Sequence, residues 1–519
     1  MPGVASTAAR RAEFVWDLQG DEIIRLYLCF VASRSQARRL DAHQLSSGAA
    51  MSEQFSFASS SETPSICILA LSQIADDPRV RRQGETFHRA GWKVTAIGLP
   101  GAKSPSPEWA ILTRSDLPAA LPNPSQCTSH PEQLTVPPKL SLRQLMLEYF
   151  RVATRPFFTA EAERQKFESK VKKVLGAILQ LAGLPRYRLR LLAIRLRPAL
   201  AEKMYWNWSG NILDIYACGR RVKVAVWLAN DWTMLPVAAR LARENGGIYG
   251  YDTHEFAVEE YAERLQWRLF QRPMVEAIER GHIRDAAVVS AVSSGIAKSL
   301  DELYCLPRPS LTIRNTPDFE DTPFRSTQRD RINVLYHGIL VPNRGLEAAI
   351  DSVALWRPEF TLTIRGPENP VFSPVLRERI AGLGLEHRVQ LAPPVPMTAL
   401  VREAAPFDVG FFALPGHSRH NEFALPNKFF EYVMAGLALC TTELPEMARL
   451  IKEYDLGVTI AAVEPEAIAA AVNALDPVRI DRFKRNALAA ARKLCWECES
   501  ERLVDAYAAV LAQAPPNFQ

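Results

Sequence analysis

The stretch that decides the fold is "SICILALSQIADDPRVRRQGETFHRAGWKVTAIGL", residues 65–99. It opens with a short apolar run of the kind that forms a buried strand. Asp77 and Pro78 follow where a helix begins, because an aspartate caps free N–H groups and a proline suits the first turn. Gly91 ends this helix, and another apolar run comes at 92–99. A strand, a helix and a strand in this order predict a parallel sheet.

The same alternation continues in two series along the chain. The first resumes at 222–231 and runs through "GIYGYDTHE" (247–255) to 286–300. A segment rich in prolines and acids, 309–330, separates it from a second series that starts at Ile332. We therefore predict an α/β protein with two doubly wound Rossmann-like domains that face a cleft. Ligands of such sheets bind beyond the carboxyl ends of the strands.

Composition narrows the class of protein. The chain has 519 residues, 48% of them hydrophobic and 23% charged, and single cores stop growing near ~250–300 residues, so more than one globular domain is expected. The net charge of +5 is too small to indicate nucleic-acid binding. Eight scattered cysteines fit a reducing compartment rather than a disulfide scaffold. No window reaches the ~18 apolar residues of a membrane span.

The positive charge is concentrated in one segment. From Lys139 to Lys203 there are 15 Lys and Arg against 5 Asp and Glu, a net charge of +10, so the rest of the chain is slightly acidic. In "LPRYRLRLLAIRLRP" (184–198) arginines alternate with leucines. Within a predicted basic helical insertion, 137–205, this pattern indicates a helix that lies on an anionic membrane surface. The alternative is a helix that packs on the N-terminal domain with its arginines in water.

A second informative stretch is "EFALPNKFFEYVMAG", Glu422 to Gly436. A helix that begins near Asn427 offers free N–H groups that suit a phosphate. Glu431, one turn in, can accept hydrogen bonds from two ribose hydroxyls. The alternative is that this carboxylate only balances the helix dipole.

A third stretch, "YHGILVPNRGLEAAI" (336–350), combines a strand, a loop with Gly338, and Arg344 followed by Gly345 at a helix start. A guanidinium in this position can clamp a diphosphate. The alternative is a solvated arginine at a helix end.

With these motifs the chain resembles the GT4 family of retaining glycosyltransferases, which have the two-domain GT-B fold. The resemblance rests on Gly338, Arg344 and Gly345, and on "LPNKFFEYVMAGLALCTT" (425–442). It extends to four shorter stretches and a closing one: 76–98, 228–232, 251–256, 290–297 and 495–511. It covers roughly 62–136 and 205–513.

The resemblance implies the roles of individual residues. Glu431 would hold the ribose and Arg344 the diphosphate, with the loop glycines, the backbone amides around Leu425, Pro426 and Asn427, and Lys428 beside the phosphates. His254 would lie across the cleft near the transferred sugar. Its alternative is a capping or packing role at a strand end. The residues that would contact the sugar or the acceptor are Asp252, Glu255 and Glu422.

The chain departs from the family pattern at two positions. Phe423 stands where the first of two glutamates is expected, and Ile339 stands where an arginine often follows the loop glycine. Lys428 is the residue that could replace the missing cation. These departures concern the sugar contact and one phosphate contact.

The resemblance also implies a division of the chain. We expect a disordered or misassigned extension, an acceptor-side domain with the basic insertion, a donor-binding domain, and closing helices that return to the first domain. Their ranges are 1–61, 62–318, 319–485 and 486–519.

The expected function is transfer of a sugar from a UDP- or GDP-linked donor to a glycan or lipid-linked acceptor, with retention of configuration. The family needs no bound metal or other cofactor. We expect a cytoplasmic protein, peripheral on the inner face of the membrane, in surface polysaccharide or glycolipid synthesis. The alternatives are a non-catalytic scaffold of the same fold and a nucleotide-sugar epimerase.

Overall fold

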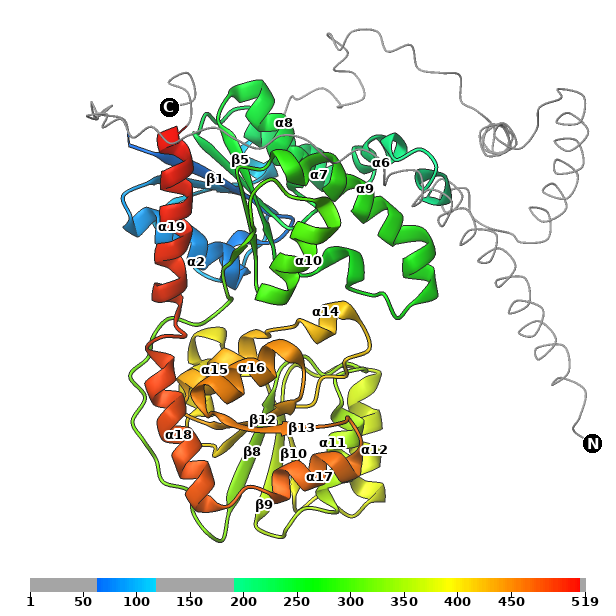
Figure 1. Cartoon of the computed structure of the whole chain (residues 1–519), viewed down its shortest axis with the longest axis vertical. Helices are drawn as coiled ribbons and strands as arrows, with labels where there is room; N and C mark the ends of the chain where they lie inside the picture. The colour runs from blue at the N-terminus through cyan, green and yellow to red at the C-terminus, as the bar shows by residue number, and fades with distance from the viewer. Residues whose placement is uncertain (1–62, 118–190, 514–519) are drawn as a thin grey trace, which may run out of the picture. The chain divides into compact units, whose positions relative to one another are not determined.

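A computed structural model describes residues 63–117 and 191–513, all within one compact unit, Glu62–Gln519. The predictions for 1–61 and for 137–190 therefore concern residues outside this description. The described chain contains two parallel sheets with helices packed against them (Figure 1).

The first sheet has seven parallel strands in the order β3-β2-β1-β4-β5-β6-β7. Its strands are β1 (Ser65–Leu69), β2 (Lys93–Ile97), β3 (Ala110–Leu112), β4 (Val226–Asn230), β5 (Ile248–Thr253), β6 (Val288–Ala291) and β7 (Leu311–Thr312). The chain order reverses between β1 and β4, and the carboxyl ends of strands beside such a switch point form the usual ligand crevice.

The longer helices of this domain are α2 (Pro78–Arg89), α6 (Ala199–Tyr205), α7 (Gly210–Gly219), α8 (Leu235–Asn245), α9 (Arg272–His282) and α10 (Ser294–Tyr304). As predicted, Asp77 caps α2, where its carboxylate accepts from the N–H groups of Arg79 (3.1 Å) and Val80 (3.2 Å). Gly91 follows the helix with a φ of +82°, which a glycine adopts without strain.

The second sheet has six parallel strands in the order β10-β9-β8-β11-β12-β13. They are β8 (Ile332–His337), β9 (Phe360–Arg365), β10 (Val389–Ala392), β11 (Val409–Phe412), β12 (Ala438–Thr442) and β13 (Gly457–Ile460). Around them lie α11 (Leu346–Val353), α12 (Phe372–Gly382), α13 (Leu400–Ala404), α14 (Arg419–Glu422), α15 (Asn427–Met434), α16 (Pro445–Tyr454), α17 (Pro465–Asn473) and α18 (Pro477–Ala491).

Strand periodicity divides the first domain's core into two clusters. Cys67 and Leu69 of β1 belong to the cluster with Trp227, whereas Ile66 and Ile68 belong to the cluster on the other face. Successive side chains of a strand point to opposite faces, so a continuous apolar run is what a strand covered on both sides requires.

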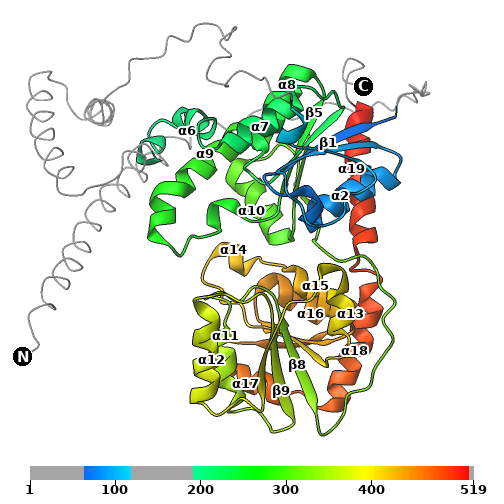
Figure 2. The ribbon, with the colours of Figure 1, turned by 180° about the vertical axis from the view of Figure 1, so that it is seen from behind.

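The last helix, α19 (Trp496–Gln513), returns to the first domain and lies beside α2 (Figures 1 and 2). Trp496 is fully buried, and its indole N–H donates to Thr86 Oγ1 at 2.8 Å. A Cβ on Gly250 of β5 would lie 1.9 Å from the hydroxyl of Tyr507, so only glycine lets this helix approach the sheet so closely. Full burial of one such aromatic side chain contributes about 1.5–3 kcal/mol. The predicted return of the C-terminal helix is confirmed.

The two domains also meet at the ends of helices. Glu446, in the first turn of α16, accepts hydrogen bonds from Ser294 Oγ (2.6 Å) and from the backbone N–H of Gly295 at the start of α10. A carboxylate is favoured there because the N-terminus of a helix carries partial positive charge.

The prediction that the basic insertion lies on a membrane surface is wrong for part of its described end, residues 191–205. Leu191 and Ile194 are only 5% and 1% exposed and belong to the core of the first domain. The alternative, a helix that packs on the N-terminal domain, therefore holds for these two residues. No helix among the described residues is long and apolar enough to cross a bilayer.

Candidate functional site

The loop after β8 carries a glycine that the geometry requires. Gly338 has a φ of +144°, and a Cβ there would lie 2.5 Å from the ammonium nitrogen of Lys428. On its other side, a Cβ on Gly366 would lie 1.9 Å from the carbonyl oxygen of Gly338. The backbone at Gly338 therefore runs directly against the lysine side chain.

Helix α15 starts at Asn427, with Pro426 as its N-cap residue and no side-chain hydrogen bond to its first turn. Leu425 is buried before it. The Lys428 ammonium lies 4.3 Å from the ring centroids of both Tyr336 and Phe412. Burial, and to a smaller extent the charge of Arg344, lowers the pKa of Lys428 to about 7, while the charge of Glu431 opposes this shift.

Arg344 precedes α11, whose N-cap residue Gly345 has a φ of +73°. A Cβ on Gly345 would lie 2.0 Å from the Ala413 carbonyl oxygen, so glycine lets this loop approach the end of β11. The pKa of His420 is lowered to about 4, mainly by burial and to a smaller extent by the positive charge of Arg344. Arg344 and Lys428 are therefore close enough for their positive charges to interact.

The carboxylates nearest these cations have other partners. Glu431 lies on the second turn of α15, and its Oε2 is 2.8 Å from His337 Nε2. Glu255 Oε2 is 3.1 Å from His420 Nε2. In the described part of the chain, no carboxylate lies within ion-pair distance of Arg344 or Lys428. Two cations without carboxylate partners suit an anionic ligand.

His337 is a site residue that the sequence did not single out. It is the last residue of β8, it is buried, and its ring stacks on Tyr432 with 4.7 Å between centroids. Both of its ring nitrogens lack a hydrogen bond of good geometry, although Glu431 is close. The pair places the Glu431 carboxylate at the carboxyl end of the first strand of this sheet.

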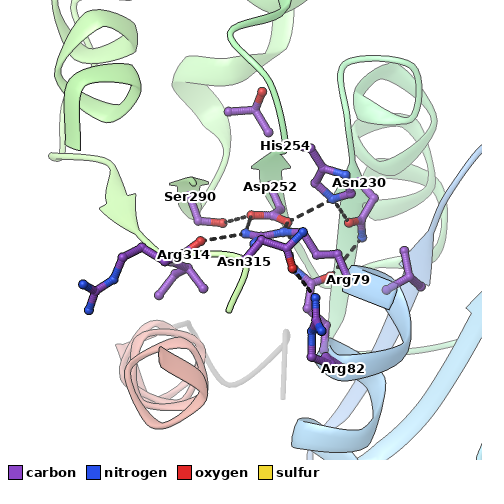
Figure 3. A network of polar contacts seen from close by, with 12 residues as sticks. Arg79, Arg82, Asn230, Asp252, His254, Ser290, Arg314 and Asn315 are labelled. Carbon is purple, nitrogen blue, oxygen red and sulfur yellow. Dashed lines mark hydrogen bonds and ion pairs between the residues drawn. The ribbon is translucent and has the colours of Figure 1, made fainter. Parts of the chain in front are cut away.

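On the other domain, His254 follows β5 with its Nε2 2.7 Å from Asn230 Oδ1 and 3.4 Å from Asp252 Oδ2 (Figure 3). The His254 side chain is 22% exposed. Burial alone would lower the pKa of His254, but Asp252 and Asp231 raise it above its usual value.

Asp252 is fully buried and does not match its predicted contact with sugar or acceptor. Arg79 donates to both of its oxygens at 2.6 Å, and Ser290 donates to Oδ1 (Figure 3). Burial by itself would raise the pKa of Asp252, yet Arg79 outweighs it and holds that pKa well below its usual range. We therefore correct this prediction, because the Asp252 oxygens are occupied and shielded from solvent.

Asp231, the residue after β4, was also missed. It has a φ of +63°, which is uncommon for a residue other than glycine and often marks a functional site. Burial raises its pKa, and the nearby charge of His254 opposes this shift. Its signal in the sequence was its place at the end of an apolar run, in "LAND".

The remaining predicted contacts lie on the segment before α15. Glu422 is half-buried at the end of α14. Phe423, which stands in place of the expected glutamate, packs against α10, where a Cβ on Gly295 would lie 2.3 Å from its ring. The Arg419 guanidinium lies 5.6 Å from the centroid of that ring. Phe423 therefore contributes to the contact between the domains.

Comparison with known proteins agrees with this architecture. Residues 331–475 match the family model described as glycosyl transferases group 1. A curated relative, the GDP-mannose:cellobiosyl-diphosphopolyprenol alpha-mannosyltransferase of Xanthomonas campestris, is 28% identical over 207 residues. The match covers 38% of this chain and 52% of the relative, so the chain spans about half the relative's length.

Solved structures match over most of the chain. Sucrose-phosphate synthase from Thermosynechococcus elongatus superposes with a TM-score of 0.58 at 14% identity, covering 87% of this chain and 100% of that one. Anabaena HepE in complex with UDP-glucose gives a TM-score of 0.55 at 12% identity, covering 86% and 99%. At such identities the likeness concerns the fold. Residues 331–475 are therefore similar to glycosyl transferases group 1, and the described chain has the two-domain GT-B fold of these solved structures.

Proposed function

We propose that the protein is a glycosyltransferase that takes its sugar from a nucleotide diphosphate donor. The observation that carries this proposal is the pair of cations, Arg344 and Lys428, without a carboxylate partner among the described residues. They lie beside the uncapped first turn of α15. Fixed cations and a helix N-terminus together bind a diphosphate and stabilise the charge that develops on it as it leaves.

With the diphosphate bound at these cations, the contacts of the ribose, the distal phosphate and the sugar can be assigned. Glu431, one turn into α15, accepts hydrogen bonds from the ribose hydroxyls, and the N–H groups of Leu425 and Asn427, on either side of Pro426, donate to the distal phosphate. His254 of the other domain faces the transferred sugar. In the reaction the bond between the anomeric carbon and the diphosphate breaks, and a bond to an acceptor hydroxyl forms with retention of configuration. The hydroxyl proton passes to the departing phosphate oxygen.

We further propose a glycan or lipid-linked acceptor, in surface polysaccharide or glycolipid synthesis at the cytoplasmic face of a membrane. The name of the Xanthomonas relative supports this choice, because it specifies GDP-mannose as donor and a diphosphopolyprenol-linked sugar as acceptor. HepE was solved with UDP-glucose. Both GDP- and UDP-linked sugars are therefore the donors to test first.

Ligand-induced stabilisation is the first experiment. A ligand present at about 100 times its dissociation constant adds about 2.7 kcal/mol to the free energy of unfolding. UDP, GDP, UDP-glucose and GDP-mannose are compared with the free nucleosides, and turnover of the sugar nucleotides is then followed with and without acceptor. Stabilisation by none of the diphosphates would contradict the proposal. Binding without any turnover would favour the scaffold, and an altered free sugar would favour the epimerase.

A further inference from the structure

A continuous set of polar contacts leads from the core of the first domain to His254 (Figure 3). Four side chains take part before it: Arg79, Gln83, Asn230 and Asp252. Each is at most 2% exposed, so water does not compete for their hydrogen bonds. We use "relay" for Asp252, Gln83 and Asn230.

The direction of the relay is set at Asp252. Its carboxylate is ionised beside Arg79, so both oxygens only accept hydrogen bonds. Gln83 lies 2.7 Å from Oδ2 and must therefore present its NH₂ group to the aspartate. The carbonyl oxygen of the same amide then faces away from Asp252.

The orientation of the Gln83 amide also fixes the direction of its hydrogen bond with Asn230. The Gln83 carbonyl oxygen is 3.2 Å from the Asn230 amide, which must donate through Nδ2. Asn230 Oδ1 is thereby turned toward His254 Nε2, at 2.7 Å, and it can only accept. The opposite orientation of either amide would bring two acceptors or two donors face to face.

His254 Nε2 consequently carries a hydrogen. The second contact of this nitrogen, 3.4 Å to Asp252 Oδ2, favours the same tautomer because a carboxylate also accepts. A neutral imidazole has a single N–H, so Nδ1 holds a lone pair. Among the described residues no hydrogen bond to Nδ1 is formed, and the side chain is partly exposed.

We propose that the relay holds the neutral ring of His254 as its Nε2–H tautomer, so that Nδ1 offers a lone pair to a hydroxyl group of the donor sugar. This inference rests on the proposed function for the identity of the ligand, whereas the tautomer follows from the protein alone. Gln83 and Asn230 are accordingly positioning residues that act through His254. The charged groups around the ring are Arg79, Asp231, Asp252 and Glu255.

The tautomer is tested first, on the full chain without ligand. Histidines are labelled with ¹⁵N and spectra are recorded at about pH 9, well above the usual histidine pKa of ~6.5. His254→Gln identifies the signal by its loss. We expect a protonated Nε2 and an unprotonated Nδ1. A protonated Nδ1 in the neutral ring would overturn the proposal.

The relay is tested by Gln83→Leu, with Asn245→Leu as a matched control. Asn245 is a half-buried amide of the same domain that donates to the carbonyls of Gly219 and Val222 outside the relay. We expect mixed tautomers and at least a tenfold lower kcat/KM for the sugar nucleotide in Gln83→Leu only, with unchanged affinity for the free diphosphate. If Gln83→Leu and Asn245→Leu change the tautomer and kcat/KM equally, Gln83 has only a structural role and the proposal is wrong.

The ligand is tested with UDP-glucose and GDP-mannose as probes. Saturation with the one that binds should shift the His254 Nδ1 signal, while the matching free diphosphate should not. A bound sugar nucleotide that leaves Nδ1 unchanged would refute the hydroxyl contact. Failure of every nucleotide to bind would instead refute the proposed function, with the tautomer result unaffected.

Discussion

The lowered pKa of Lys428 predicts that donor binding weakens as the pH rises above neutrality. Burial against Tyr336 and Phe412, together with the charge of Arg344, lowers its pKa to about 7. The diphosphate of a sugar nucleotide keeps its charge over this range, so the change comes from the protein. The ligand-free protein holds the ammonium below about pH 7 and loses it as the pH rises through that value. Binding is therefore strongest at the lower pH.

The size of the effect follows from the linkage between protonation and binding. At two pH units above the pKa about one molecule in 100 keeps the ammonium, and each pH unit corresponds to about 1.36 kcal/mol of binding free energy. The affinity for the donor does not fall without limit, because Arg344 still binds the diphosphate when Lys428 is neutral. A hydrogen bond to a charged group contributes about 1.5–3 kcal/mol, and Lys428 is already half deprotonated at pH 7, so we expect a fall of roughly 5- to 30-fold in affinity between pH 7 and 9.

Isothermal calorimetry with UDP-glucose and GDP-mannose measures this fall, and two buffers of different ionisation enthalpy show proton uptake on binding near pH 8. Lys428→Arg keeps its charge throughout this range and should give a flat profile, because an arginine is not deprotonated in proteins. Lys428→Met should be flat and weak. A constant affinity of the wild-type protein, or the same fall in Lys428→Arg, would refute the assignment of the titrating group.

Three further substitutions test the remaining parts of the site. Arg344→Ala should weaken UDP or GDP more than the free nucleoside, since only the diphosphate carries the charge it contacts; equal weakening would indicate a structural role. Glu431→Ala should lose the ribose contacts, each worth about 1.5–3 kcal/mol, in a protein that still folds; an unchanged nucleotide affinity would exclude the ribose contact. Arg79→Met should lower the free energy of unfolding in urea by about 3–5 kcal/mol, because Asp252 stays buried without its partner, and Arg79→Met with Asp252→Asn should recover part of that loss.

Local patterns were sufficient to predict most of the strands and helices, but not the two short edge strands β3 and β7, the second of which lies in the segment 309–330 that was predicted to be a link between domains. The Asp77 cap, the proline after it and Gly91 are signals contained in a few consecutive residues, and the structure places all three as predicted. The same holds for the start of α15 at Asn427 and for the glycine loop before Arg344. These features are encoded by neighbours in the chain, so a single sequence is enough to find them.

The relay could not be predicted because its contacts join distant parts of the chain. Arg79 and Asp252 are 173 positions apart. In the sequence Arg79 stands beside Arg81 and Arg82 and has the pattern of a solvated helix face. Only the packing of α2 on β5 shows that one of the three is buried in an ion pair. The packing of Leu191 and Ile194 into the core is a similar case, since arginine–leucine alternation fits a membrane surface and a domain surface equally well.

The departure from the family pattern at Ile339 has a physical consequence for the pH dependence of the site. Ile339 follows the loop glycine and is 60% exposed, so it supplies no charge at the point where related chains often have an arginine. The ammonium of Lys428 instead lies close to Gly338, where an added Cβ would be 2.5 Å from its nitrogen. An arginine would keep its charge at every physiological pH, whereas the half-buried Lys428, with a pKa of about 7, does not. If Lys428 is the replacement, the site gains a sensitivity to pH that the arginine would not give, and introducing Ile339→Arg should restore part of the affinity that the wild-type protein loses at pH 9.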